Sequence, residues 1–135
     1  MKKILEFLKC YWPSMIVLAV IFYATLASDP AGADELPPIP HIDKLIHAIM
    51  MGGLVGAVAF DYKRAERQTR MLTSRFMLVL TISVMAFGVV DEFLQSAVDN
   101  GRSFEGADIL ADWAGAWIAF FTAPPAIRKV LKVKA

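Results

Sequence analysis

Cysteine, histidine and excess charge are all scarce in this chain of 135 residues. The single Cys10 excludes an internal disulfide and a cluster of thiolate metal ligands, and it precedes the first apolar block, unlike a lipid-modified cysteine. A formal net charge of +1 argues against nucleic acid as a partner. The chain also lacks a nucleophile motif, a phosphate-binding loop and a two-histidine metal spacing, so we expect no cofactor and no resident metal.

Apolar residues, in contrast, are abundant and come in blocks. Hydrophobic types make up 57% of the chain, and its mean hydropathy is +0.52. The blocks are too long for strands, and a run of ~17–25 apolar residues is the length that spans hydrocarbon. We therefore predict an all-α membrane protein: one domain over residues 1–135, built as a bundle of four transmembrane helices. The spans cover about residues 12–28, 43–60, 76–98 and 107–123.

The first block, Trp12–Ser28, has a rival interpretation as a signal peptide. Lys2 and Lys3, an apolar middle and the end at Thr25–Ala27 imitate the three regions of such a peptide. We favour a retained span because further spans follow it. Pro13 falls in its first turn, where a helix tolerates proline.

The segments between the spans differ in character. Asp29–Ile42 is rich in proline and has no Lys or Arg, which predicts extended chain. Asp61–Arg75 is predicted to be a polar connector, and Asp99–Gly106 a turn. Pro124 and Pro125 are predicted to stop the fourth span.

Basic residues alternate between the two sides of the predicted bundle. Lys and Arg number three before the first span, none in the first loop, five in the second loop, one in the third loop and four in the tail. Because Lys and Arg accumulate in cytoplasmic loops, this alternation predicts that both termini are cytoplasmic.

Polar residues, all but one of them ionisable, gather where the predicted spans meet the outer face. They fall at the start of the second span, the end of the third, the third loop and the start of the fourth: Asp43, Lys44, His47, Asp91, Glu92, Gln95, Arg102, Asp108 and Asp112. A helix rises ~1.5 Å per residue, so those on helices lie within about 10–12 Å of the outer boundary. Charged groups at membrane depth are costly and mark functional sites, so these nine residues are our candidates for a shared polar site.

Helical spacing refines this prediction. Three pairs are spaced i, i+4 and share a helix face: Asp43 with His47, Asp91 with Gln95, and Asp108 with Asp112. Asp91 and Glu92 diverge by ~100°, so we expect one to line the site and the other to reach the interface or Arg102. Two small-residue strips predict close helix packing: Gly52 with Gly56, and Ala111 with Gly115 and Ala119.

Together these motifs resemble the VanZ-like membrane proteins. The resemblance is carried by Asp43-Lys44-Leu45-Ile46-His47, by Asp91-Glu92-Phe93-Leu94-Gln95, and by Arg102 and Asp108 six apart with Gly115 following. It implies a small polytopic protein of the bacterial inner membrane that is concerned with the cell envelope. The protein for which the family is named is associated with resistance to teicoplanin-type antibiotics. Ala48, Met51 and Asp112 stand where the family commonly has an aromatic residue, a tyrosine and an asparagine, which bears on any ligand preference set by the pocket walls.

Three classes of function fit these residues. We favour a binding module whose outward-facing pocket holds a membrane-lipid headgroup, a lipid-linked envelope precursor or a glycopeptide, with Arg102 and His47 on its anionic part. An enzyme acting on a lipid-linked phosphate or acyl substrate would use His47 with Asp91, Glu92 and Asp108 as base, acid or hard-cation site. A proton-coupled transporter would require a homo-oligomer. The same residues also fit a purely structural polar network.

Overall fold

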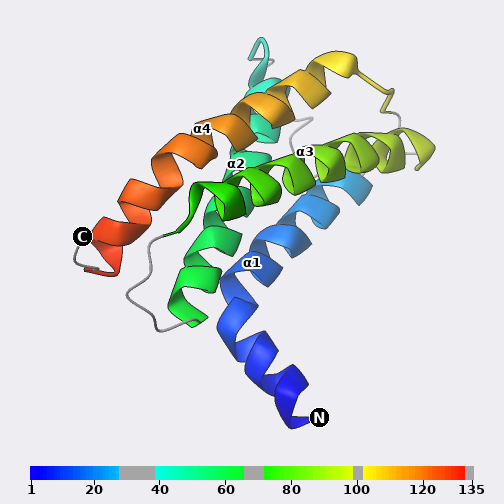
Figure 1. The fold of residues 1–135 in the computed structure, drawn as a ribbon. Helices are drawn as coiled ribbons and strands as arrows, with labels where there is room; N and C mark the ends of the chain where they lie inside the picture. Colours follow the sequence, from blue (N-terminus) through cyan, green and yellow to red (C-terminus); the bar gives the residue numbers. More distant parts are fainter. Residues whose placement is uncertain (28–38, 66–71, 99–101, 133–135) are drawn as a thin grey trace.

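The computed structural model describes residues 1–27, 39–65, 72–98 and 102–132. Within these residues it contains four α-helices and no strand: α1 (Lys2–Leu26), α2 (Ile42–Ala65), α3 (Ser74–Ala97) and α4 (Gly106–Val130) (Figure 1). The predicted all-α architecture of four helices is therefore confirmed. Most of the proline-rich loop lies outside the described residues.

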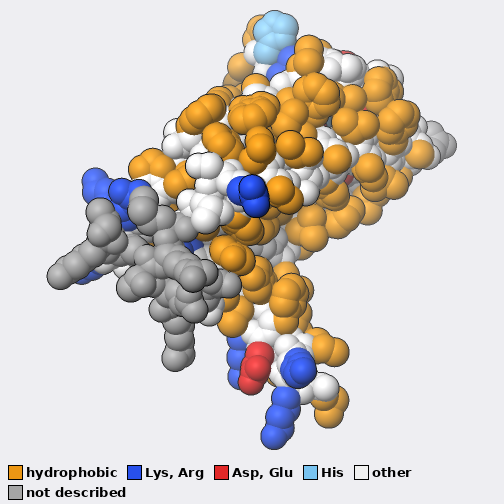
Figure 2. Space-filling model, viewed as in Figure 1, with side chains coloured by type: hydrophobic (Ala, Val, Ile, Leu, Met, Phe, Trp, Pro, Cys, Tyr) orange, Lys and Arg blue, Asp and Glu red, His pale blue; other side chains and the backbone are white. Residues whose placement is uncertain are grey.

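Three of the helices, α1, α2 and α3, are long and apolar enough to cross a membrane. The fourth helix, α4, has 25 residues, but charged side chains shorten its apolar run: Asp108 and Asp112 near its start, and Arg128 and Lys129 near its end. Its most extensive contact is with α2, against which it packs across the bundle (Figure 1). Figure 2 shows hydrophobic side chains over most of one face of the molecule.

The contact between α2 and α4 depends on two glycines. A Cβ added to Gly52 would lie 2.8 Å from the carbonyl oxygen of Gly115, and a Cβ added to Gly115 would run into the backbone of Ala48. The predicted close approach is therefore present at Gly52 and Gly115. The predicted role of Gly56 is wrong, because its Cβ position has no neighbouring atom within 4 Å.

The substitution Gly52→Ala should destabilise the fold, whereas Gly56→Ala should not. At Gly52 the obstacle is backbone, which cannot rotate away, so we expect a loss of about 1–3 kcal/mol in the free energy of unfolding. The matched Gly56→Ala variant carries the same change in helix propensity without the clash. Denaturant unfolding in detergent micelles, followed by circular dichroism, measures both. Equal stability of the two variants would contradict this packing.

Helix α1 is bent near its start. Tyr11 has non-helical dihedral angles, φ −110° and ψ 18°. Pro13 follows two residues later, in the first turn of the second part of the helix, as the sequence predicts. The bend divides a short basic N-terminal segment from the apolar segment that packs in the bundle (Figure 1).

Two side chains of α2 bind the backbone groups released by this bend. The Ser14 N–H and hydroxyl donate to Asp61 Oδ2 at 2.9 and 2.6 Å. Arg64 donates to the carbonyl oxygen of Cys10 and pairs with Asp61 Oδ1 at 3.1 Å. In a regular helix the Ser14 N–H would bond to the Cys10 carbonyl, so Asp61 and Arg64 replace that bond from outside. Both lie in α2, which continues to Ala65, so the prediction of a connector from Asp61 is wrong for these five residues.

Removing Asp61 should therefore cost far more than a surface acid. Asp61 is fully buried, and loss of one member of a buried ion pair costs about 3–5 kcal/mol. We expect Asp61→Ala to lower the free energy of unfolding by about that amount. Glu6→Ala, at an exposed position of α1, should leave it nearly unchanged. The double variant Asp61→Ala/Arg64→Ala should lose less than the two single losses combined. Strict additivity would show that the two side chains do not act together.

The C-terminal end of α4 also differs from the prediction. Pro124 and Pro125 lie inside the helix, which ends at Val130. Proline cannot donate its backbone hydrogen bond, but its fixed φ is compatible with helix. Ala123 and Ile127 on either side are buried in the core, and this burial holds the last turns in place.

Candidate functional site

One end of the bundle collects the predicted polar residues. It is formed by the C-terminal ends of α1 and α3, the N-terminal ends of α2 and α4, and the turn at residues 102–105 (Figure 1). Six of the nine candidates are buried there: His47, Asp91, Glu92, Gln95, Asp108 and Asp112. Polar burial on this scale requires that the groups satisfy one another or a ligand.

His47 of α2 lies between two carboxylates of α4. Its Nδ1 is 3.1 Å from Asp112 Oδ1, and its Nε2 is 3.8 Å from Asp108 Oδ2. Asp108 and Asp112 are one helical turn apart, so they reach both sides of a single imidazole ring. Asp112 is completely buried and Asp108 is 7% exposed.

Lys44 links the interior to the surface. Its Nζ lies 2.9 Å from Asp43 Oδ2, 3.2 Å from Glu105 Oε2 and 3.4 Å from Asp108 Oδ1. These contacts tie the N-terminal turn of α2 to that of α4. Asp108 is thus shared between Lys44 at the rim and His47 inside.

Asp91 and Glu92 are both buried, each 1% exposed. Asp91 accepts a hydrogen bond from the Thr25 hydroxyl of α1 at 2.9 Å, and Glu92 accepts one from the backbone N–H of Glu105 at 2.7 Å. The prediction that only one of them points inward is wrong. Because α3 contacts α1, α2 and α4, side chains that diverge by ~100° still both reach the interior.

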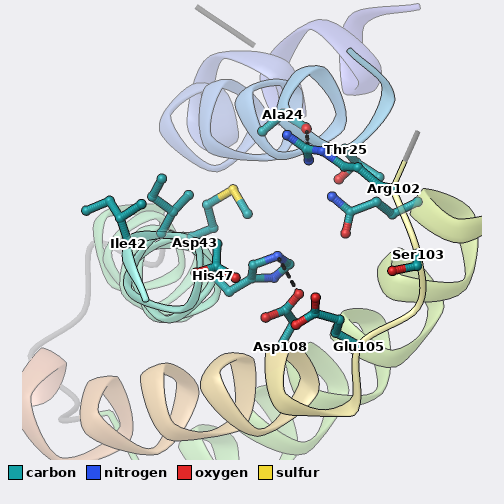
Figure 3. A pocket seen from close by; sticks show the side chains of 12 residues that line it. Ala24, Thr25, Ile42, Asp43, His47, Arg102, Ser103, Glu105 and Asp108 are labelled. Carbon is teal, nitrogen blue, oxygen red and sulfur yellow. Dashed lines mark hydrogen bonds and ion pairs between the residues drawn. The ribbon is translucent and has the colours of Figure 1, made fainter. Parts of the chain in front are cut away.

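Arg102 extends from the turn toward α1. It donates to the Ala24 carbonyl oxygen at 3.0 Å (Figure 3). With the Gln95 amide turned so that its oxygen accepts from Arg102, its nitrogen donates to Glu92 Oε2 at 3.2 Å. Asp108 makes its ion pairs with Lys44 and His47.

A cavity of about 490 Å³ opens among these groups (Figure 3). Five of the predicted residues line it: Asp43, His47, Gln95, Arg102 and Asp108. The other four do not: Lys44 lies at the rim, and Asp91, Glu92 and Asp112 lie behind the lining. Sequence reasoning missed three further polar lining residues, Thr25, Ser103 and Glu105. Thr25 is a single hydroxyl in an apolar span, and Glu105 is a single acid in a turn. Neither residue forms part of a sequence pattern that indicates a site.

The cavity has walls of different charge. Arg102 lies beside α1, while Glu105 and Asp108 lie together on the α4 side, with His47 between (Figure 3). Ile46 of α2 adds an apolar part and is 45% exposed on the outer surface of the bundle. The site therefore offers a cation, an acidic pair and an apolar edge to one ligand.

The fold and this buried cluster define a small helical protein with three helices of membrane-spanning character, which indicates a membrane protein. The model of the family described as VanZ/LLP1 matches residues 4–128. The chain therefore belongs to the VanZ/LLP1 family, and the resemblance found in the sequence is confirmed. No curated protein and no solved structure matches the chain.

The two histidines of the chain allow a direct test of the cluster. His47→Ala would leave the buried Asp112 and Asp108 without the imidazole between them, and loss of a partner of a buried charge costs about 3–5 kcal/mol. We expect a loss of that size in the free energy of unfolding. His41 is exposed, and His41→Ala should change stability little. Chemical denaturation of both variants in the same detergent makes the comparison, and matching midpoints would contradict a central role for His47.

Proposed function

We propose that this protein lies in the bacterial inner membrane with both termini in the cytoplasm, and that its cavity opens to the extracytoplasmic side and binds the headgroup of an envelope lipid. In this arrangement α4 is the fourth membrane span. Its packing against α2 through Gly52 and Gly115 supports a shared orientation across the bilayer.

The distribution of basic side chains supports the orientation. The last turn of α2 carries Lys63 and Arg64, and the last turn of α4 carries Arg128 and Lys129. Both turns lie at the end of the bundle opposite to the cavity, together with the basic start of α1 (Figure 1). Lys and Arg favour the cytoplasmic side, so the cavity faces outward.

The observation that carries the ligand proposal is the opposed charge within the cavity. The planar guanidinium of Arg102 suits a phosphate, and the acidic pair of Glu105 and Asp108 across the cavity suits an ammonium group (Figure 3). A zwitterionic phospholipid headgroup carries both charges. A volume of about 490 Å³ falls in the range of small-ligand sites, and the exposed apolar edge at Ile42 and Ile46 suits contact with acyl chains.

An enzyme acting on a lipid-linked substrate is the second candidate, and one observation favours it. The His47 ring is held at Nδ1 by the buried Asp112 carboxylate, and a base oriented by a third group is the arrangement that general-base catalysis uses. Turnover of a lipid-linked substrate by the purified protein would establish this candidate, and bound but unchanged lipid would favour the binding module.

Lipid retention should depend on Arg102. Native mass spectrometry of the protein extracted in its own lipids should show a bound phospholipid. Because a hydrogen bond to a charged group contributes about 1.5–3 kcal/mol, Arg102→Ala should reduce this adduct about tenfold or more. Arg75→Ala, at the other end of the bundle, removes the same charge and should leave the adduct intact.

Two outcomes would contradict the lipid assignment. A folded Arg102→Ala variant that carries as much phospholipid as the wild type would remove Arg102 from the site. A wild-type protein that carries no phospholipid but binds added teicoplanin would reassign the cavity to glycopeptides.

A further inference from the structure

Although the sequence predicts no resident metal, we propose that His47, Glu92 and Asp108 bind a hard divalent cation of the Mn²⁺ or Mg²⁺ class at the base of the cavity. This goes beyond the proposed headgroup function and does not depend on it. One ligand atom from each side chain, His47 nitrogen and one carboxylate oxygen from each acid, lies within 4.8 Å of the other two. All three side chains are buried, and they come from three different helices.

The spacing is close to that of a coordination shell. Atoms bound to one cation at about 2.1 Å are separated by no more than about 4.2 Å. His47 Nε2 and Asp108 Oδ2 are already 3.8 Å apart, and the widest separation in the group, 4.8 Å at most, needs only a small side-chain rotation to close.

Buried carboxylate oxygens without hydrogen-bond donors are a second sign of a missing partner. In the part of the chain that the structure describes, four carboxylates are buried at this end of the bundle: Asp91, Glu92, Asp108 and Asp112. Among the described residues, Asp108 Oδ1 and Asp112 Oδ2 are buried oxygens that accept no hydrogen bond. Asp108 Oδ1 lies 3.4 Å from Lys44 Nζ. Buried carboxylates without donors are costly, and a divalent cation offsets that cost.

The surroundings of His47 match those of a metal ligand. Metal-binding histidines commonly donate their second ring N–H to a carboxylate, which fixes the tautomer. With the Nδ1 proton donated to Asp112 Oδ1 at 3.1 Å, Nε2, which lies 3.8 Å from Asp108 Oδ2, is the nitrogen left to bind a cation. Glu92 is held in turn by the backbone N–H of Glu105. His47 and Asp108 line the cavity, so a bound cation would face it with an open coordination position.

The donor set selects the ion. Two carboxylates and one imidazole are mostly hard donors, which favour Mn²⁺ and Mg²⁺ over ions that prefer thiolates. Cys10, the only thiol of the chain, lies beside Arg64 at the opposite end of the bundle. Mn²⁺ is the better probe because it is paramagnetic.

The test is a titration of the full chain, stripped with chelator and purified in a non-ionic detergent, with Mn²⁺ followed by electron paramagnetic resonance. We expect one Mn²⁺ per chain, displaced by excess Mg²⁺. The near-isosteric variants Glu92→Gln and Asp108→Asn should each weaken binding more than about tenfold, and Asp112→Asn, which only positions His47, about 10–100-fold. Circular dichroism checks that each variant is folded.

A matched control separates this site from a neighbouring acidic group. Asp43, Glu105 and Asp108 also lie within 4.8 Å of one another but two of them are exposed. Glu92 belongs only to the buried group, so Glu92→Gln should weaken Mn²⁺ binding, while Glu6→Gln, at the exposed start of α1, should leave the affinity unchanged. Full Mn²⁺ affinity in Glu92→Gln would overturn the buried site. Nitrogen coupling from one imidazole, measured by electron spin echo on the wild type, tests the site without any variant.

Absence of stoichiometric Mn²⁺, absence of nitrogen coupling, or tight binding of Zn²⁺ alone would each overturn the proposal. Lipid retention is measured separately, by native mass spectrometry of the Arg102→Ala and wild-type proteins. A protein that retains phospholipid but takes up no Mn²⁺ therefore refutes the cation site and leaves the headgroup function standing.

Discussion

The backbone contact between α2 and α4 is the constraint on which the rest of the structure depends. Because neither Gly52 nor Gly115 has a side chain, the two helices approach until Ala48 and Gly115 meet backbone to backbone. His47 immediately precedes Ala48, and Asp112 precedes Gly115 by three residues. The helix crossing therefore places the imidazole against the carboxylate. Larger residues at the crossing would separate the helices and the polar pair together.

The bundle keeps its polar chemistry at its two ends. At one end Asp61 and Arg64 complete the backbone of bent α1. At the other, His47 and the acids surround a cavity. Between the two ends the core is mainly apolar: Ile21, Met51 and Val55 are fully buried, and so is the hydroxyl-bearing Thr81. Asp61 and Arg64 form hydrogen bonds with backbone groups of α1. At the cavity end, by contrast, carboxylate oxygens of the described residues have no hydrogen-bond donor. This difference distinguishes a structural network from a candidate binding site.

Much of this architecture could be predicted from the sequence because long apolar blocks and dense charges are strong signals. The four helices follow from block length, and the gathering of His47 with Asp108 and Asp112 follows from helical spacing and topology. The functional use of these residues stays a prediction. The sequence places Asp61 and Arg64 in a connector, because nothing in it indicates that they bind the backbone of α1. That role depends on the bend at Tyr11, which exposes backbone groups.

Other departures have the same origin in tertiary packing. Local rules end a helix at Pro124, but burial of Ala123 and Ile127 outweighs the lost hydrogen bonds. Local rules also separate Asp91 from Glu92, but they do not reveal that α3 contacts helices on both sides. Glu105 acquires its role only through long-range contacts with Lys44 and Glu92.

Asp108 connects the mouth of the cavity to its floor. One of its oxygens faces the Lys44 ammonium and the other faces His47. An anion that binds at the mouth would attract Lys44 away from Asp108. The carboxylate of Asp108 would then attract a positive charge at the floor of the cavity more strongly. By reciprocity, positive charge below would loosen Lys44 and favour the anion above. One carboxylate thus gives this small bundle the means for two opposite charges to assist each other's binding.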